Sequence, residues 1–462
     1  MREFWTVVHR WLGLTAALFL IVAGATGAVI SWDHEIDEWL NADIMHTPGR
    51  GTLRNPLALA AAVEADDPRV EVSYMTLALE EGHAASFLVR PKKDPATGRA
   101  HVLDYNNVFV DPVTAKITGH RDSKSIALSK RNLMSWLRHL HESLHMPAFW
   151  GSDRWGFWLM GGIALMWLID SFVALYLTLP RRLAARRMSM PSTAPATVVS
   201  QRSGTEEGPP RTEGAVPLHR RLRGGSRGRP SGVSGSGGGK SWWKRWQPSW
   251  MVRWRAGGYK LNFDLHRAGG LWVWAIIIVV SFTSFSLNLY REVFYPVMSQ
   301  ISKTTPGPYE TIKPAPFGSF IEPKISFASA IDIARAEGQR QGFEFAPGGI
   351  WYGGDFPFYN ISFFDPTDEM GTGGMGMSNI YVSADNGEVL GMYRPWHGSA
   401  ADVFVQLQLP LHSGRILGMT GRIMMSIMGV FVVMLSITGI VIWERKRRAR
   451  KATARALVAS AA

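Results

Sequence analysis

Two copies of one short motif carry the residues of this chain that are best suited to chemistry. The motif occurs as His9-Arg10-x-x-Gly13 and His266-Arg267-x-x-Gly270, each at the start of a long apolar run. Imidazole is a common ligand of metal ions and haem iron. The 462-residue chain has no cysteine, which excludes disulfides, iron–sulfur clusters, covalently attached haem and thiolate zinc sites. A metal or cofactor would therefore be held by histidine, carboxylate or methionine.

Two further candidate histidines stand just before the other two apolar runs. His141 and His145 are four residues apart in a segment, 126–146, that predicts a helix, so they share a face of it. His412 precedes the last apolar run. Asp170 lies inside the second run, where an ionisable group is costly and usually faces the interior of a helix bundle. We expect Asp170 to move protons, to orient a ligand or to make a structural hydrogen bond.

Four segments are apolar and long enough to cross about 30 Å of hydrocarbon. They are residues 11–30, 155–179, 271–289 and 423–443. The first is longer than the apolar core of a signal peptide and lacks a small-residue cleavage site, so we interpret it as an uncleaved anchor. The chain should therefore contact the lipid bilayer along four transmembrane helices.

The charge of the loops predicts the orientation of these helices. Residues 181–260 hold seventeen lysines and arginines against three glutamates, and residues 445–451 are also basic. The positive-inside rule then places both termini and the 181–260 loop in the cytoplasm. The loops 33–154 and 291–415 lie outside, in the periplasm if the membrane is the inner membrane of a bacterium. No nucleic-acid partner is expected, because the topology explains the basic loop and no recognition motif occurs in it.

The two halves of the chain repeat one another in order. His9 corresponds to His266 at an offset of 257 residues, and His141 corresponds to His412 at an offset of 271. Between these landmarks an offset of 272 relates Val110 and Gly119 to Val382 and Gly391. Each half is thus predicted to be a helix, an outer α+β module and a second helix. Because both halves begin on the same side, the repeat is parallel.

The predicted fold class is therefore membrane α-helical, with a four-helix transmembrane bundle from a parallel internal duplication and two periplasmic α+β modules. The expected boundaries are 1–32 (first transmembrane helix), 33–154 (first module), 155–180 (second helix), 181–262 (basic cytoplasmic linker), 263–290 (third helix), 291–415 (second module), 416–444 (fourth helix) and 445–462 (basic tail). Within the linker, residues 181–240 have the composition of a disordered segment. Residues 242–255 combine five tryptophans with basic residues, which is typical of a segment lying on the membrane surface.

Local patterns predict some elements of the modules. We expect helices at 55–65 and 326–337, and strands at 85–90, 101–110, 350–352 and 359–364. Turns that lead into strands are expected at 111–119 and 383–391. The methionine- and glycine-rich segment 370–377 could bind a soft metal, but a flexible loop is the simpler interpretation.

The repeat pairs the four candidate histidines, His9 with His266 on the cytoplasmic side and His141 with His412 on the periplasmic side. Two imidazoles that face each other in a bundle are what a six-coordinate b-type haem requires. A lone interfacial histidine is more often a capping residue, but four at repeat-related positions in a chain without thiols favour ligation. His145 and His34 are alternates on the outer side. The other histidines are expected to be solvated: His46, His83, His101, His120, His139, His219 and His397.

Four arginines are candidates for pairing with haem propionates, and they could equally anchor the helices at the bilayer surface. They are Arg10, Arg267, Arg415 and Arg422.

These features together resemble the PepSY-associated transmembrane family, and within it the inner-membrane haem proteins that reduce ferric siderophores. The matching features are the two His-Arg-x-x-Gly motifs, the 111–119 and 383–391 turns of the PepSY-like outer modules, Leu140-His141, Pro410-Leu411-His412-Ser413-Gly414-Arg415, Gly421-Arg422, and Thr438-Gly439 before the basic tail. The resemblance covers nearly all of the chain except residues 181–240. The first half departs from the pattern, since Gly156-Phe157 stands where the second half has Gly421-Arg422.

The resemblance implies an oxidoreductase of iron transport that carries two haem b groups in a four-helix membrane bundle. Such a protein passes electrons to a ferric siderophore or other iron chelate in the periplasm and releases Fe(II) for uptake. The chain has no glycine-rich nucleotide-binding turn after a strand in its predicted cytoplasmic parts, so the electron donor is expected to be quinol or a separate reductase.

Two other functions remain open at this point. One is a non-enzymatic, membrane-anchored PepSY protein that binds peptides or regulates a partner, for which the bundle histidines are not needed. The other is a haem reductase with a different acceptor, such as a flavin or a quinone.

Overall fold

The computed structural model describes residues 1–180, 241–365 and 374–461. The chain divides into two compact units, one made of Met1–Thr178 with Ser249–Ala462 and the other of Leu179–Pro248. The segment 181–240, for which disorder is predicted, lies outside the described residues. The described part of the second unit holds the short helix α7 (Trp242–Trp246), whose N-cap Ser241 accepts a hydrogen bond from the Lys244 amide. Trp242 and Trp243 on this helix are exposed.

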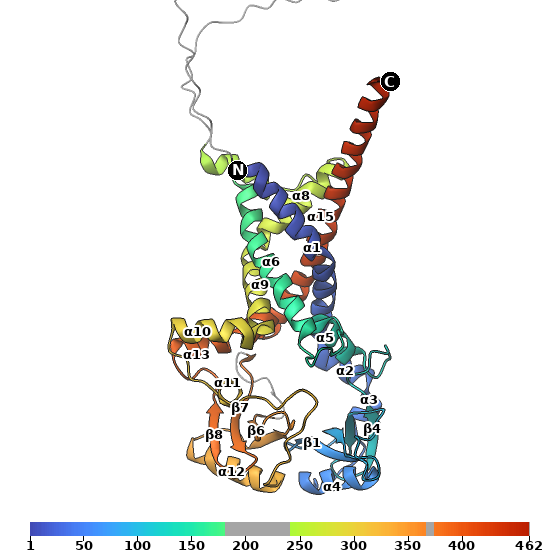
Figure 1. Ribbon diagram of the computed structural model, residues 1–462, viewed down its shortest axis with the longest axis vertical. Coiled ribbons are helices and arrows are strands. Elements are labelled where there is room, and N and C mark those ends of the chain that lie inside the picture. The colour runs from blue at the N-terminus through green and yellow to red at the C-terminus, as the bar shows by residue number, and fades with distance from the viewer. Residues whose placement is uncertain (181–240, 366–373, 462) are drawn as a thin grey trace, which may run out of the picture. The chain divides into compact units, whose positions relative to one another are not determined.

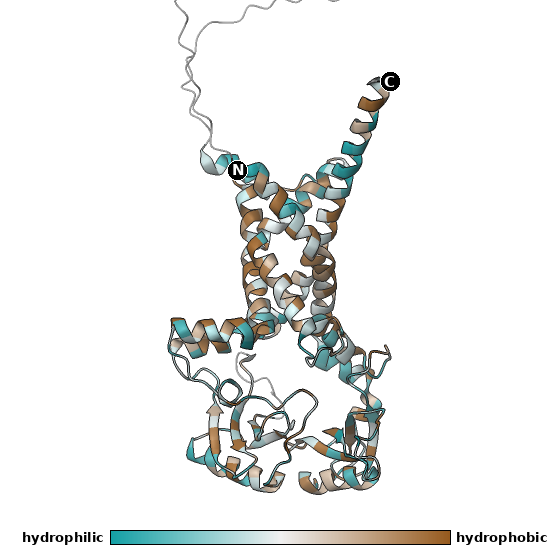
Figure 2. Ribbon diagram, viewed as in Figure 1, coloured by the Kyte–Doolittle hydropathy of each residue, from teal (hydrophilic) through white to brown (hydrophobic). Residues whose placement is uncertain are grey.

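The first unit contains the apolar helices (Figure 1). Within the described residues, three helices are long and apolar enough to cross a membrane: α1 (Arg2–Ile30), α6 (Trp155–Thr178) and α15 (Gly418–Ala461). The helices α8 (Gly258–Trp272) and α9 (Trp274–Asn288) meet at an angle of 70° and are together long and apolar enough for a fourth span if the bent pair crosses as one unit. Hydrophobic residues predominate along the middle of these helices, whereas the part of α15 that holds the basic tail is largely hydrophilic (Figure 2). The four predicted apolar segments therefore coincide with helices.

Two of these helices differ from the sequence-based expectation. The third span is not one straight helix, because the backbone leaves the helical conformation at Val273 (φ −107°, ψ 8°). Gly269 and Gly270 lie just before the break, and glycine weakens a helix by roughly 1 kcal/mol relative to alanine. The fourth helix does not end near residue 443 but continues to Ala461, because the basic tail is free of glycine and proline and rich in helix-forming residues.

Close backbone contact joins α1 and α15. A Cβ atom added at Gly24 would lie 2.8 Å from the carbonyl oxygen of Gly429, and one added at Gly429 would lie 2.4 Å from that of Gly24. Small residues at such a crossing allow two apolar helices to approach without a side chain between them. This crossing fixes the relative position of the first and last helices of the chain.

The extramembrane part is one antiparallel sheet of eight strands in the order β4-β3-β2-β1-β5-β6-β7-β8. The strands are β1 (Val70–Thr76), β2 (Ala85–Pro91), β3 (Asn107–Val110), β4 (Ile117–Arg121), β5 (Pro347–Trp351), β6 (Phe358–Phe363), β7 (Ser378–Ser383) and β8 (Val389–Tyr393). Two outer modules were expected, and the strands of both loops lie in one sheet. The joining pair is β1 with β5, in which Met75 lies opposite Ile350. Strand β1 was not predicted.

The order of the strands is symmetric about this central pair. Each half is a four-stranded meander covered by one helix, α4 (Pro56–Asp66) or α12 (Phe327–Arg340). The register of β3 against β4 shifts between Phe109 and Val110, and that of β7 against β8 shifts between Tyr381 and Val382. The predicted offset of 272 residues relates these two irregularities to one another.

A continuous core lies between the sheet and the two helices. It includes the fully buried side chains of Leu59 on α4 and of Phe87, Ile350, Ile361 and Ile380, which come from both halves of the sheet. Burying an aliphatic side chain contributes about 1.5–3 kcal/mol, so the two halves stabilise one another through shared apolar contacts.

Two predicted elements of the first outer loop are shorter in the structure. The strand expected at 101–110 is confined to β3, and the helix expected at 126–146 is α5 (Leu133–Ser143). The residues before α5 form a loop around Asn132, whose amide donates to the Ala127 carbonyl at 2.9 Å and whose Oδ1 accepts from Ser129 at 2.6 Å. These side-chain hydrogen bonds compete with the backbone hydrogen bonds that a helix would make at this point.

Short helices connect the spans with the sheet. They are α2 (Asp33–Leu40), α3 (Ala42–Met45), α10 (Tyr295–Ile301), α11 (Pro308–Thr311), α13 (Ala400–Gln406) and α14 (Gln408–Ser413), with a π-helical turn at Tyr290–Phe294 and 3-10 turns at Gln247–Trp250 and Arg415–Leu417.

Candidate functional site

The four candidate histidines form two pairs. His9 on α1 and His266 on α8 have ring centres 6.1 Å apart, with an angle of 47° between the ring planes. His141 on α5 and His412 on α14 have ring centres 6.1 Å apart, with an angle of 54°. Residues that are more than 250 positions apart in the sequence are thus brought together in both cases.

The spacing of each pair matches that of two imidazoles on opposite sides of one metal ion. A metal–imidazole bond of about 2.0 Å, plus about 1.1 Å from the ligating nitrogen to the ring centre, puts the two centres roughly 6 Å apart. Directly stacked rings would lie closer together. Both pairs therefore leave room for one metal atom between the rings.

Each imidazole of the first pair is anchored through Nδ1. The His9 Nδ1 lies 2.9 Å from Oδ1 and 3.0 Å from Oδ2 of Asp170 on α6. The His266 Nδ1 lies 3.0 Å from the Leu435 carbonyl oxygen and 3.1 Å from the Thr438 hydroxyl, both on α15. A hydrogen bond at Nδ1 fixes the ring and leaves Nε2 available as a ligand, which is the usual arrangement of metal-bound histidine. Asp170 thus has the geometry of a ligand-orienting residue.

The second pair is anchored by two threonines. The His141 Nδ1 lies 3.0 Å from the Thr26 hydroxyl on α1, and the His412 Nδ1 lies 3.1 Å from the Thr283 hydroxyl on α9. Sequence reasoning missed both threonines. A signal was present, because the offset of 257 residues that relates His9 to His266 also relates Thr26 to Thr283. Across the described residues, no hydrogen bond occupies Nε2 of any of the four histidines.

Glycines give two of the imidazoles their space. A Cβ atom at Gly27 of α1 would lie 3.0 Å from Cε1 of His141, and a Cβ atom at Gly439 of α15 would lie 3.1 Å from Cε1 of His266. Both distances are below ordinary van der Waals contact, so a larger residue would push the ring away from its position. Each glycine thus lies on the same helix as the residue that makes the hydrogen bond to Nδ1 of the ring it faces.

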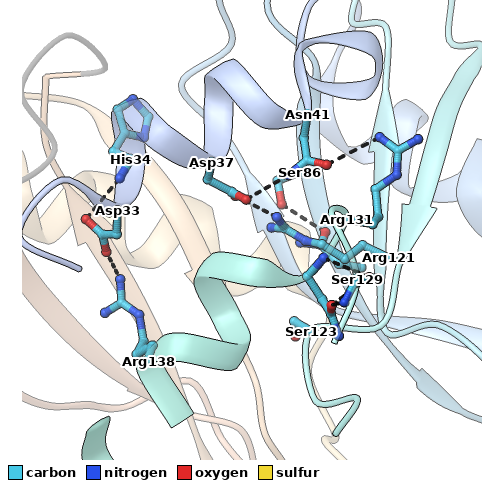
Figure 3. A network of polar contacts seen from close by, with 12 residues as sticks. Asp33, His34, Asp37, Asn41, Ser86, Arg121, Ser123, Ser129, Arg131 and Arg138 are labelled. Atoms are coloured by element: carbon cyan, nitrogen blue, oxygen red, sulfur yellow. Dashed lines mark hydrogen bonds and ion pairs between the residues drawn. The ribbon is translucent and has the colours of Figure 1, made fainter. Parts of the chain in front are cut away.

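A cavity of about 480 Å³ adjoins the second pair and is lined by residues of α1, α5, α6, α9, α14 and α15, including His141 and His412. This volume falls in the range of small-molecule and cofactor sites, about 300–1,000 Å³. Most of the lining is apolar, and the charged residues gather at one end: Asp33, Arg138, Glu142 and Arg415. Arg138 is ion-paired with Asp33 (Figure 3). Burial raises the pKa of Glu142, although the charge of Arg138 opposes this.

The four candidate arginines have different surroundings. Arg415 lines the cavity and lies 3.5 Å from Asp33. Arg422 instead pairs with Glu35 at 2.6 Å and donates to the Ser31 carbonyl, so its charge is already matched at the end of α1.

Arg10 and Arg267 each directly follow one histidine of the first pair in the sequence. Arg267 pairs with the buried Asp264 at 3.1 Å. Arg10 stacks on the Trp11 ring at 5.3 Å, and its Nε is buried with no hydrogen-bond partner in the described residues. A buried N–H group that lacks a hydrogen-bond partner, such as Nε of Arg10, is suited to binding an anionic group.

The alternates His145 and His34 are not brought to either pair. The His145 Nε2 bonds to the Trp136 carbonyl at 2.8 Å, and its ring packs against the Trp136 and His139 rings. His34 is exposed on α2. The methionine-rich segment 370–377 lies partly outside the described residues, and within its described part Met375 is buried and its carbonyl accepts from the Tyr393 hydroxyl.

The fold and these contacts define a class of protein, namely a helical membrane protein with several apolar spans and a separate sheet domain. The chain matches the family model described as PepSY-associated TM region over residues 6–203 and 233–446. It therefore belongs to the PepSY-associated transmembrane family, as its motifs predict. A comparison with curated proteins gives no match.

Proposed function

We propose that this protein carries electrons across a bacterial inner membrane through two b-type haems and reduces a ferric chelate, such as a siderophore complex, in the periplasm. One haem is held by His9 and His266 and the other by His141 and His412. The observation that carries the proposal is the presence of two histidine pairs with equal spacing between the ring centres. In the described residues, each ring makes a hydrogen bond through Nδ1 and none through Nε2.

The positions of the pairs along α1 fit a transmembrane path. His9 is on α1, and the His141 ring contacts Gly27 of the same helix. The eighteen residues between these positions span about 27 Å at 1.5 Å per residue, close to the hydrocarbon thickness of about 30 Å. Under the positive-inside orientation, the first pair lies on the cytoplasmic side, where quinol or a separate reductase would deliver electrons. The second pair lies on the periplasmic side with the cavity beside it.

The residues of the chain have distinct tasks in this proposal. Bound haem supplies one-electron exchange between Fe(III) and Fe(II). The four histidines would hold the haem iron, and Asp170, Thr26, Thr283 and Thr438 would keep each imidazole in the tautomer that has Nε2 free. Arg138 and Arg415 share one carboxylate, Asp33, at one end of the cavity, and guanidinium groups that share a single partner can also bind propionates or the anionic groups of an iron chelate. A chelator with hard oxygen donors holds Fe(II) more weakly than Fe(III), so reduction releases the metal for uptake.

An absorption spectrum of the purified full-length protein tests this proposal. Protein from haem-replete cells should show the bands of low-spin, bis-histidine haem, with two haems per chain. His266→Ala and His412→Ala should each remove one haem, whereas His101→Ala, in the loop before β3 and outside both pairs, should keep both. A colourless wild-type preparation, or variants with an unchanged haem content, would refute it.

Re-oxidation of the dithionite-reduced protein identifies the acceptor. The proposal expects a ferric siderophore to re-oxidise it faster than a flavin or a quinone does. A faster reaction with flavin or quinone would instead indicate a haem reductase with another acceptor. Full cellular function of a variant that lacks all four paired histidines would favour the non-enzymatic binding protein.

A further inference from the structure

Three side chains that the haem proposal does not use gather on the first half of the extramembrane part. Glu38 lies on α2, His46 directly follows α3, and His83 lies in the loop before β2. Their side chains are 31%, 46% and 50% exposed, so an ion from solvent can reach them. Sequence reasoning predicted His46 and His83 to be merely solvated.

The ligand atoms of these residues converge on one point. The Nε2 atoms of His46 and His83 lie 3.3 Å and 3.5 Å from Oε1 of Glu38, and the three ligand atoms all lie within 4.8 Å of one another. Ligands of a tetrahedral ion with bonds of about 2.05 Å are roughly 3.3 Å apart. Neither contact has the alignment of a hydrogen bond, so the group is arranged as ligands around a common centre.

Backbone pairing holds the two imidazoles side by side. His46 and His83 lie opposite each other in an isolated antiparallel bridge. On either side of them the Thr47 amide donates to the Gly82 carbonyl at 2.9 Å, and the Ala84 amide donates to the Met45 carbonyl at 2.8 Å. Side chains at directly opposed positions share a face of the ladder. The ring centres are 5.1 Å apart, and this spacing does not depend on any ligand.

The position of Glu38 is fixed by its helix. Next to it, Asp37 pairs with Arg121 of β4 at 2.6 Å, and both side chains are nearly buried. Asn41, at the end of the same helix, donates to Asp37 at 2.8 Å (Figure 3). Glu38 is therefore carried on a helix that is bound to the sheet. A second carboxylate, that of Glu80, lies 3.6 Å from Nδ1 of His83, where an outer carboxylate orients a metal-bound imidazole.

We infer that Glu38, His46 and His83 form a binding site for a divalent transition-metal ion. Two imidazoles and one carboxylate, with positions left for water, suit Zn²⁺ or Fe²⁺. Calcium and magnesium take oxygen ligands instead. The set lies outside both histidine pairs, and no residue of it lines the cavity beside His141 and His412.

The location suggests which ion reaches the site, and this step rests on the proposed function. Asp33 at the start of α2 lines the cavity, and Glu38 follows five residues later, about 7.5 Å along the helix axis. Reduction of a ferric chelate at the cavity would release Fe²⁺ next to this helix. The site would then offer a set of protein ligands on the same helix that borders the cavity.

Equilibrium dialysis of the tag-free, full-length protein against Co²⁺, followed by elemental analysis, tests the inference. We expect one Co²⁺ per chain, displaced by an excess of Fe²⁺ under anaerobic conditions, since Fe²⁺ generally binds more weakly than Co²⁺. The double variant His46→Ala/His83→Ala and the variant Glu38→Gln should bind Co²⁺ at least tenfold more weakly, and His101→Ala should bind it as the wild type does. All substituted side chains are solvent-accessible, and a circular-dichroism melt checks that each variant is folded.

Two results would overturn the inference: no Co²⁺ binding by the wild type, or equal binding by the wild type and the double variant. The same dialysis on His412→Ala separates the two proposals. Binding of Co²⁺ by that variant shows that the metal site stands without the second haem. Binding by a haem-free wild-type protein that is lost in the His46→Ala/His83→Ala variant would support this site while refuting the proposed function.

Discussion

Replacing Asp170 with asparagine tests the link between α6 and the first histidine pair. The substitution keeps the size of the side chain and removes its negative charge beside the His9 Nδ1, which lies 2.9 Å away. A nearby negative charge stabilises Fe(III) relative to Fe(II). Its removal should therefore raise the midpoint potential of a haem bound between His9 and His266.

The geometry gives the size of this effect. The contact at 2.9 Å, the width of the imidazole and the metal–nitrogen bond place the carboxylate about 6.5 Å from the metal position. At an effective dielectric constant of about 20, two unit charges at that distance interact by roughly 2.5 kcal/mol, or about 110 mV for one electron. The side chains of His9 and Asp170 are 28% and 11% exposed, so solvent screening lowers the expected shift to about 50–110 mV.

A spectroelectrochemical titration of Asp170→Asn measures this shift. Thr438→Val is the matched control, because it removes a neutral partner of His266 on the other side of the same site while the Leu435 carbonyl still accepts from Nδ1. The control should change the potential by less than about 20 mV. An equally small shift in Asp170→Asn, or a shift confined to the other haem, would refute the electrostatic reasoning.

Three further outcomes follow from the fold. Gly429→Val should destabilise the α1–α15 crossing and lower the thermal midpoint in detergent, whereas Gly162→Val, where an added Cβ meets nothing within 4 Å, should have a much smaller effect. Ile350→Ala, at a fully buried position of the central strand pair, should lower the free energy of unfolding of the sheet domain by about 2–4 kcal/mol in a denaturant titration. The hydrogen bonds of Arg69 lower the pKa of Asp67 in the folded state, so Asp67 stabilises the fold above pH 4 and loses this contribution as the pH falls below it. The difference in the free energy of unfolding between pH 7 and pH 3 should therefore be smaller in Asp67→Asn than in the wild type. An unchanged difference would contradict this assignment.

Much of the architecture could be predicted from the sequence because it depends on length and repetition. An apolar run of about 20 residues has few alternatives to a membrane span. The offset of 257 residues relates His9 to His266 and would also have identified Thr26 and Thr283. The offset of 272 anticipates the matching register shifts at Val110 and Val382.

Other features depend on contacts that no local pattern records. Gly269 and Gly270 weaken the helix before Val273, but two glycines do not specify that α8 and α9 meet at 70°. The pairing of β1 with β5 joins residues about 275 positions apart, and neither strand is marked by a turn that specifies its partner. His46 and His83 are 37 positions apart, and only the antiparallel bridge between their segments brings the two imidazoles to Glu38.

The central pair of strands has a consequence for the history and engineering of this chain. Strands β1 and β5 occupy corresponding places in the two meanders and run antiparallel, as two copies of one strand do across the twofold axis of a symmetric dimer. A polypeptide of half this length would leave that strand as an unpaired edge, which is a template for association with another chain. Such a half-protein would be expected to complete its sheet by self-association.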